Sequence, residues 1–185
     1  MRSRLVLSKS SAWASSACAV YALIACTPAL AAECSNVMTL ENGIQAKFCV
    51  SSVLKPQGAN TYGPDNLRLA DDKSWCEGVA GEGVGEWITI SFPFKDVTVK
   101  KITITNGYGK SAKSFAENST AKRIELTTKE GVKESKLNLP DTSEPETWVF
   151  DKSFTTSEIK LTITDVYGKK KYQDTCINAI SVSAE

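Results

Sequence analysis

The chain has 185 residues, with 22 lysines and arginines against 21 aspartates and glutamates and a formal net charge of +1. This balance gives no broad electrostatic attraction to nucleic acid or to an anionic membrane. The sequence contains no histidine, which excludes Ser-His-Asp and Cys-His catalysis and histidine-ligated zinc. Catalysis by a pair of carboxylates or by a lysine is not excluded by this composition.

Residues 1–31 are typical of an export signal peptide. Basic residues precede an apolar run that ends at Cys26 and is too short for a comfortable membrane span, and Ala29-Leu30-Ala31 supplies an A-x-A cleavage site. We therefore predict a mature chain that begins at Ala32 and is periplasmic or extracellular. The alternative is processing at a lipobox, residues 23–26, which would leave a lipid on Cys26 and anchor the protein to a membrane as a lipoprotein.

The mature chain is predicted to form one domain. Removing 31 of the 185 residues leaves 154, enough for one domain with a buried core but hardly for two. Within this domain we expect an N-terminal hairpin and loop over residues 32–61 and a β-sandwich over residues 62–185.

Four cysteines remain after signal removal, namely Cys34, Cys49, Cys76 and Cys176. In an oxidising compartment they predict two disulfides, for which three pairings exist. Asn42-Gly43 suits a type I′ hairpin turn, and the register of that hairpin brings Cys34 near Cys49. We therefore favour Cys34–Cys49 and Cys76–Cys176. A metal site is a weak alternative because the spacing contains no C-x-x-C pair.

Seven segments after the hairpin and loop show the alternating apolar pattern and the β-branched composition of strands. They are residues 86–92, 97–105, 121–128, 134–139, 147–151, 158–166 and 177–183. Lys100-Lys101 breaks one alternation, as a β-bulge would, and Gly131 marks a tight hairpin. No long mature segment keeps a helical apolar period. The predicted fold is therefore all-β, a disulfide-stapled jelly-roll β-sandwich.

The glycine-rich stretch over residues 74–92 raises the question of a phosphate cradle. Gly81, Gly83 and Gly85 are spaced G-x-G-x-G, whereas a dinucleotide fingerprint needs G-x-G-x-x-G at the start of a helix. The residues that follow alternate as a strand does. A nucleotide site is therefore disfavoured.

Three loops combine aromatic and polar side chains, the mixture that a saccharide site needs for the ring face and the hydroxyl groups of a sugar. The candidate ligand-binding residues are Trp75 and Glu77 in the first loop, Asn106, Tyr108, Lys110, Asn118 and Lys122 in the second, and Tyr167 and Asp174 in the third. The structural alternative is that Trp75 and Tyr167 pack the end of the sandwich, while Asn106-Gly107 and Gly168 make turns.

The same loops resemble the NADase-type glycan-binding domain, a discoidin-like (F5/8 type C-like) module known as the translocation domain of bacterial NAD glycohydrolase toxins. The motif W-x-E-G matches from Trp75, N-G-Y-x-K-S from Asn106 and N-S-x-x-K from Asn118, within a resemblance that covers about residues 62–182. The resemblance implies a galactose-binding-like jelly roll without catalytic activity, in which residues 78–85 form a turn that leads into a core strand.

Two departures from the family pattern bear on the site. Thr120 stands where the family usually has arginine, which removes one donor to a hydroxyl or an anion. Asn178-Ala179-Ile180 replaces the usual S-E-I, and Ala70-Asp71-Asp72 replaces the usual D-G-D. In related discoidin-like modules an acidic residue in each place helps to hold a structural calcium ion, so the second change weakens such a site. We therefore predict no cofactor, with a weakly supported structural calcium ion as the alternative.

These observations together predict an exported, non-catalytic carbohydrate-binding module. Its expected partner is a glycan or glycoconjugate and not a nucleic acid. One alternative is a protein-binding accessory or inhibitor domain on the same fold. A less favoured alternative is an enzyme associated with NAD glycohydrolase activity.

Overall fold

The computed structural model describes residues 31–40, 42–169 and 171–184, so nearly all of the predicted signal peptide lies outside the described residues, including the lipobox. In these described ranges, no helix has the length and apolar character needed to span a membrane.

The elements are almost all strands, and each of the seven predicted strand segments is present. The strands are β1 (Glu33–Cys34), β2 (Met38–Thr39), β3 (Gln45–Val50), β4 (Trp75–Cys76), β5 (Trp87–Ser91), β6 (Val97–Asn106), β7 (Ser119–Thr128), β8 (Gly131–Asn138), β9 (Pro145–Thr156), β10 (Glu158–Tyr167) and β11 (Thr175–Ala184), with the helix α1 (Ala112–Glu117) and a 3₁₀ turn (Pro64–Arg68).

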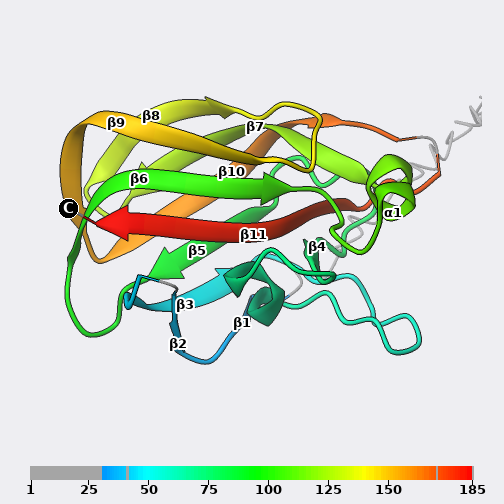
Figure 1. Cartoon of the computed structure of the whole chain (residues 1–185), viewed down its shortest axis with the longest axis horizontal. Helices are drawn as coiled ribbons and strands as arrows, with labels where there is room; N and C mark the ends of the chain where they lie inside the picture. Colours follow the sequence, from blue (N-terminus) through cyan, green and yellow to red (C-terminus); the bar gives the residue numbers. More distant parts are fainter. Residues whose placement is uncertain (1–30, 41, 170, 185) are drawn as a thin grey trace, which may run out of the picture.

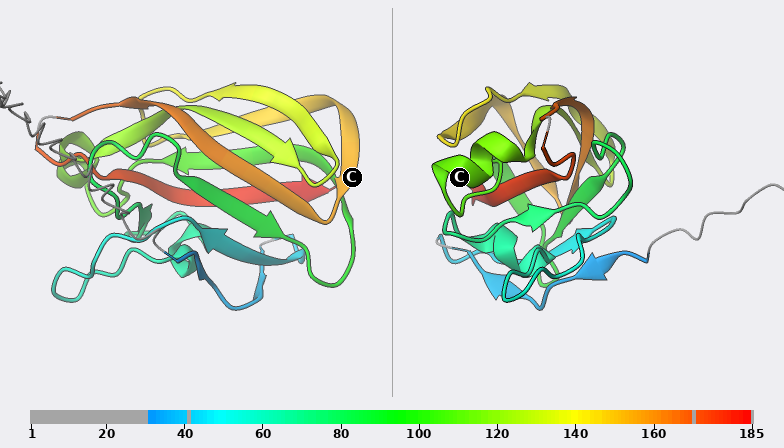
Figure 2. Two further views of the ribbon diagram at one scale, coloured as in Figure 1. Left: turned by 180° about the vertical axis from the view of Figure 1, so that it is seen from behind. Right: turned by 90° about the vertical axis from the view of Figure 1, so that its right-hand side faces the viewer.

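The strands form the two layers of a β-sandwich (Figure 1). One layer has the order β1-β3-β5-β10-β7, with β2 beside β3 and β8 beside β7, and the other contains β9, β6, β11 and β4. A short parallel pairing of Thr175 with Ser119 and of Cys176 with Thr120 joins β11 to β7. Seen end-on, the strands enclose one core (Figure 2). Jelly-roll topology thus confirms the predicted fold class.

The core follows directly from the alternating sequence pattern. Successive side chains of a strand point to opposite faces, so every second residue of a strand faces the other layer. Ile88 and Ile90 of β5 and Ile102 and Ile104 of β6 are buried in this way. The predicted bulge is present as well, because the pairing of β6 with β9 shifts register between Val99 and Lys101.

The N-terminal hairpin differs from its prediction in the turn. Gly43 has φ +81°, and no described residue other than glycine has a positive φ, so Asn42 does not adopt the geometry that a type I′ turn requires. The amide of Leu40 donates to the carbonyl of Ile44, which makes a three-residue loop with Gly43 as the left-handed residue. The three-residue loop has a lower conformational cost than a type I′ turn, because it needs a positive φ at Gly43 alone and glycine takes a positive φ without a steric penalty.

The three-residue loop also changes the register of the hairpin. The observed pairs, Met38 with Ala46 in β2–β3 and Cys34 with Cys49 in β1–β3, are offset from those of a two-residue turn. The loop accounts for the pairing of Met38 with Ala46, and a further shift of one residue between β2 and β1 places Cys34 directly opposite Cys49, where the disulfide Cys34–Cys49 is present.

The second predicted disulfide, Cys76–Cys176, is also present and spans 100 residues. It links β4 to β11. Next to it, Trp75 of β4 pairs antiparallel with Ile177 of β11. The chain around Trp75 is thereby held against the first residues of the last strand, at the end of the sandwich that carries α1 (Figure 1).

Candidate functional site

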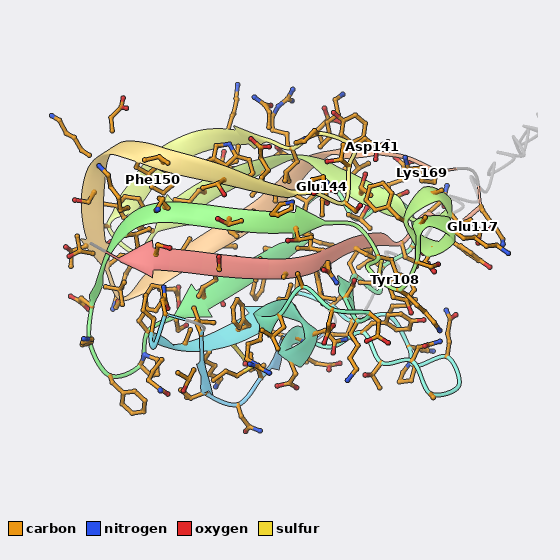
Figure 3. All side chains as sticks on the ribbon, in the orientation of Figure 1. Tyr108, Glu117, Asp141, Glu144, Phe150 and Lys169 are labelled. Atoms are coloured by element: carbon orange, nitrogen blue, oxygen red, sulfur yellow. A yellow bond between two sulfur atoms is a disulfide. The ribbon has the colours of Figure 1, made fainter. Side chains whose placement is uncertain are left out.

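A cavity of about 200 Å³ opens at the α1 end of the sandwich. It is formed by the loop after β3, by the segment from the end of β6 through α1, and by the loop between β10 and β11. Its lining residues are Leu54, Gln57, Asn60, Tyr62, Tyr108, Lys110, Ser114, Glu117, Asn118, Tyr172 and Asp174. Figure 3 labels Tyr108 and Glu117 at this end of the molecule.

The floor of the cavity is a small apolar cluster separate from the main core. Tyr62, Tyr108 and the disulfide Cys76–Cys176 pack together there. The two tyrosine rings meet edge to face with their centroids 5.7 Å apart. Burial, together with the neighbouring Tyr62 hydroxyl, raises the pKa of Tyr108 to about 12. The Tyr108 hydroxyl therefore stays protonated and can act as a hydrogen-bond donor.

The helix α1 positions Asn118 at the cavity. The hydroxyl of Ser111 caps the helix by accepting a hydrogen bond from the amide of Ser114 at 3.1 Å. At the other end, the side-chain amide of Asn118 donates to the carbonyl of Ser114 at 2.8 Å. The side-chain oxygen of Asn118 receives no hydrogen bond from the described residues, so it can accept one from a ligand.

Two lysines are bound at the rim of the cavity. Lys110 donates through Nζ to Oδ1 of Asn60 at 2.8 Å. Lys171 pairs with Oε2 of Glu117 at 2.8 Å and lies 5.0 Å from the ring centroid of Tyr172. Tyr172 is 44% exposed, so beside Lys171 it still offers part of its side chain as an aromatic surface that a ligand can reach.

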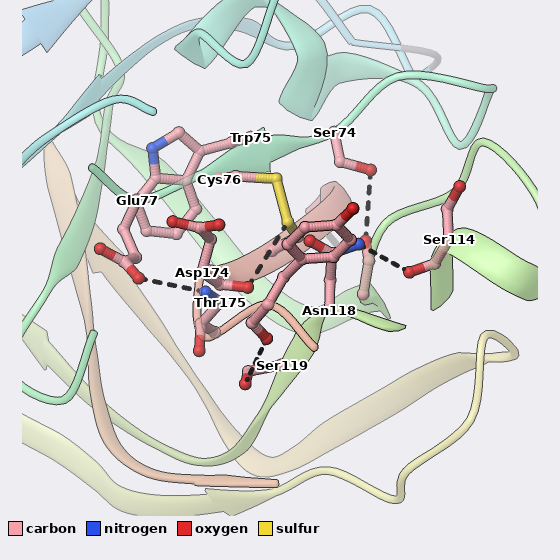
Figure 4. Close-up of a disulfide and its surroundings, with 12 residues drawn as sticks. Ser74, Trp75, Cys76, Glu77, Ser114, Asn118, Ser119, Asp174 and Thr175 are labelled. Atoms are coloured by element: carbon pink, nitrogen blue, oxygen red, sulfur yellow. Dashed lines mark hydrogen bonds between the residues drawn. A yellow bond between two sulfur atoms is a disulfide. The ribbon is translucent and has the colours of Figure 1, made fainter. Parts of the chain in front are cut away.

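Two carboxyl groups lie at the start of β11 (Figure 4). Asp174 lines the cavity, and partial burial raises its pKa. Glu77 is completely buried, and its carboxylate accepts hydrogen bonds from the amides of Thr175 at 3.1 Å and of Val79 at 2.8 Å. Burial raises the pKa of Glu77 to about 7 despite these two bonds, and the nearby charges of Asp174 and Glu86 act in the same direction.

Four of the nine predicted ligand-binding residues lie together in the cavity lining: Tyr108, Lys110, Asn118 and Asp174. Three others are buried. Trp75 is 0% exposed, and its indole donates to the carbonyl of Ser52 at 2.9 Å. Asn106 donates to the carbonyl and accepts from the amide of Ala121. Together with the buried Glu77, these residues hold the loops in place and offer no surface to a ligand. For Trp75, the structural alternative, in which it packs the end of the sandwich, is therefore confirmed.

The remaining two predicted residues lie outside the cavity lining. Lys122 pairs with Asp165 at 3.0 Å and lies 5.7 Å from the ring centroid of Tyr167. The ring of Tyr167 is thus partly covered by a cation of the chain itself.

Seven of the 11 lining residues are not among the predicted ligand-binding residues. Gln57, Asn60 and Tyr62 belong to the loop after β3, which the sequence indicates only as an irregular, polar segment. Glu117 and Tyr172 lie in the second and third predicted loops but were not selected. The usable signal was the tyrosine next to amide side chains at residues 57–62, the same mixture that marked the other loops.

Thr120 does not reach the cavity. It is buried, and its hydroxyl donates to Oδ1 of Asp141 at 2.8 Å. Oδ2 of the same carboxylate pairs with Lys169 at 2.5 Å, and both residues are labelled in Figure 3. The residue that replaces the usual arginine therefore helps to hold the loop that carries Tyr172 and Asp174.

The residues that could hold a calcium ion do not fit one. The side-chain nitrogen of Asn178 donates to the carbonyls of Asp71 and Lys73 and lies 3.2 Å from the hydroxyl of Ser74. A cation in this place would need oxygen ligands, whereas Asn178 supplies a donor. Across the ranges that the structure describes, no group of three or more Asp, Glu, Cys or His side chains could hold a metal ion.

A second cavity, of about 430 Å³, lies at the opposite end of the sandwich, where β5 connects to β6. Its lining includes Ile44, Phe94 and Val97, and Phe94 is 73% exposed. This cavity contains Lys95 but no carboxylate, so of these two cavities the one at the α1 end combines aromatic rings with amides and carboxylates.

The two-layer fold places this chain in the class of discoidin-like β-sandwich modules. Solved structures with the same fold include the family 32 carbohydrate-binding module of NanJ from Clostridium perfringens in complex with galactose, at 17% identity, with a TM-score of 0.55 and coverage of 74% of this chain and 92% of that one. Another Clostridium perfringens module of family 32, in complex with GalNAc-β-1,3-galactose, has 17% identity, a TM-score of 0.57 and coverage of 75% and 95%.

Within this class, the chain belongs to the family described as the NAD glycohydrolase translocation F5/8 type C domain, whose profile matches residues 39–183. The match covers the disulfide Cys76–Cys176 and all three segments that form the cavity. A search of curated proteins finds no match.

Proposed function

We propose that the protein is an exported, non-catalytic glycan-binding module and that the cavity at the α1 end holds the saccharide. The observation that carries this proposal is the convergence of aromatic rings, amides and carboxylates in one cavity. Tyrosine rings pack against the apolar face of a sugar, and amides and carboxylates bind its hydroxyl groups. Two modules with the same fold were solved with galactose or a galactose-containing disaccharide.

The size of the cavity suits the end of a glycan chain. At about 200 Å³ it is smaller than the cavities that enclose drug-sized ligands, which measure roughly 300–1,000 Å³. It therefore has room for one sugar unit, with the rest of the glycan lying over the exposed ring of Tyr172. A shallow site of this kind binds in the micromolar to millimolar range, about −8 to −4 kcal/mol.

The carboxylates of the cavity support a non-catalytic role. Glycoside hydrolysis ordinarily needs two carboxyl groups, one of them a general acid with a raised pKa and the other a base or nucleophile. Glu117 is paired with Lys171 at the rim, and Glu77 is buried with both oxygens bound to backbone amides. Asp174 is then the carboxylate of the lining that a ligand can use, and no second free carboxylate of the lining is available as its partner.

The export part of the proposal is supported by the signal pattern of residues 1–31 and by the two disulfides. Mass spectrometry of the exported protein tests it. An N-terminus at Ala32 or Glu33 supports ordinary cleavage, whereas a diacylglyceryl group on Cys26 would establish a lipoprotein.

The binding proposal is tested with a glycan array, followed by titration of the strongest hit. Tyr172→Ala should weaken binding about fivefold or more, because a stacked aromatic supplies roughly 1 kcal/mol beyond its area. Phe94→Ala is the matched control, since Phe94 is an exposed aromatic at the opposite end, and it should leave affinity unchanged. Equal affinities of both variants would move the saccharide away from this cavity.

Two further outcomes would overturn the function itself. Absence of binding to any glycan on the array, with the protein shown to be folded, would favour the protein-binding alternative. Release of nicotinamide from NAD by the purified protein would contradict a non-catalytic role.

A further inference from the structure

Some charged side chains of the cavity have a bonding partner within the described residues, and one does not. Its lining contains one lysine, Lys110, against two carboxylates, Glu117 and Asp174. Lys110 is bound to Asn60, and Glu117 is bound to Lys171. Across the described residues, by contrast, no lysine or arginine pairs with Asp174, and no other side chain donates a hydrogen bond to its carboxylate.

The surroundings of Asp174 make this negative charge costly. The residue lies between the disulfide-linked floor and the buried Glu77, and partial burial raises its pKa. A half-buried carboxylate is stabilised by an opposite charge or by hydrogen-bond donors, and no side chain among the described residues supplies either to Asp174. The missing cation is therefore one that a ligand can bring.

A second acceptor of the cavity lining has the same preference. The side-chain nitrogen of Asn118 donates to the carbonyl of Ser114, and its side-chain oxygen receives no hydrogen bond from the described residues. The carboxylate of Asp174 and the amide oxygen of Asn118 are therefore open acceptors, and both favour a ligand rich in N–H or O–H donors.

The rim shows that this kind of surface holds an ammonium group. The Nζ atom of Lys171 lies between the carboxylate of Glu117, at 2.8 Å, and the ring of Tyr172, 5.0 Å from its centroid. A carboxylate beside a tyrosine ring is the combination that attracts organic cations. Asp174 lines the same cavity as Tyr108 and Tyr172 but has no ammonium of its own.

We propose that the cavity selects an amino sugar, a saccharide unit with a free protonated amine, and that this ammonium group pairs with Asp174 while Asn118 accepts a further hydrogen bond. Neutral sugars bind more weakly through their hydroxyls, and acidic sugars are rejected. This inference rests on the proposed glycan-binding function and specifies its ligand class.

The expected preference follows from the strength of the bonds. A hydrogen bond between two charged groups is roughly twice as strong as a neutral one, so replacing a hydroxyl by an ammonium against Asp174 should improve affinity about five- to tenfold. A uronic acid brings a carboxylate against Asp174 and should bind more weakly than the neutral sugar by a similar factor.

The test is calorimetric titration of the purified protein with two matched series: galactose, galactosamine and galacturonate, and glucose, glucosamine and glucuronate. At about pH 6.5 the amines are protonated and the uronates ionised. The expected order is amine, then neutral sugar, then acid, in the series that binds. Asp174→Asn should reduce the preference for the amine to twofold or less. Asp151→Asn is the charge-matched control, an exposed aspartate on β9, and should keep the preference.

Each outcome decides a separate point. Equal binding of amine and neutral sugar, or tightest binding of the acid, would overturn the inference and leave the glycan-binding function standing. A preference for the amine that persists in a folded Asp174→Asn variant would also overturn it, because the ammonium would then lie elsewhere. Absence of binding to any sugar of either series, together with an empty glycan array, would overturn the proposed function as well.

Discussion

Burial of Glu77 should make the stability of this protein fall as the pH rises. Its side chain is completely buried and packs closely against the backbone of Gly83, where an added Cβ atom would lie only 2.6 Å from the Cγ of Glu77. Burial raises the pKa of Glu77 from 4.5 to about 7. The folded state therefore binds this proton more tightly than the unfolded state, and stability is lost progressively between about pH 4.5 and 7.

The size of the effect follows from that interval. At about 1.4 kcal/mol for each pH unit, the interval between 4.5 and about 7 corresponds to a loss of about 3 kcal/mol in the free energy of unfolding. Glu77→Gln removes the titration but places an amide nitrogen against one of two backbone N–H donors, from Val79 and Thr175. That substitution should cost about 1–3 kcal/mol at acidic pH, where the native carboxyl is protonated.

Denaturant unfolding at a series of pH values between 4 and 8 measures both effects. The native protein should lose stability with rising pH, the Glu77→Gln variant should lose less, and the difference between the two should shrink toward pH 7. Glu144→Gln is the control, because Glu144 is exposed in the loop between β8 and β9 (Figure 3). Parallel curves for the native protein and Glu77→Gln would refute the reasoning.

Two further predictions concern the covalent and polar ties of the fold. Replacing Cys76 and Cys176 together by alanine should destabilise the protein by about 4–5 kcal/mol, and replacing Cys34 and Cys49 by about 3 kcal/mol. The losses differ because the first bridge spans 100 residues and the second 15. Equal losses of stability in denaturant unfolding would contradict an origin in loop entropy. Asn178→Asp should make the melting temperature depend on calcium, whereas a chelator should not change that of the native protein; a chelator-sensitive native protein would show that the Asn178 amide does not replace a cation.

The strands could be predicted because their signal is local. Alternation along β5 and β6 reports which side chains face the core, and the break at Lys100-Lys101 reports the bulge. The geometry of the turns was harder to predict from the sequence. Asn42-Gly43 indicates a hairpin, but whether one or two residues adopt a positive φ is settled by how the strands on each side pack, and the observed loop uses Gly43 alone.

The site was predictable only in part, for a related reason. Composition marked the loops that carry Tyr108, Lys110, Asn118 and Asp174, since aromatic and polar residues there have no strand pattern to satisfy. The same composition could not distinguish these residues from Trp75, whose indole is fully buried and bonded to a backbone carbonyl. Burial depends on which segments far apart in the chain pack against a residue.

The sequence by itself determined the all-β class, the family and the two disulfide pairs, because strand periodicity, motif spacing and cysteine positions are properties of the linear chain. Only the tertiary structure decided which loops meet. It brought the loop after β3 to the cavity and buried Trp75 and Glu77. Within the described part of the chain it also left Asp174 without a cation, while Lys110 and Lys171 are each bound to another side chain. Pairings of this kind join residues across the whole chain, and their energies depend on distances that exist only once the two layers have closed.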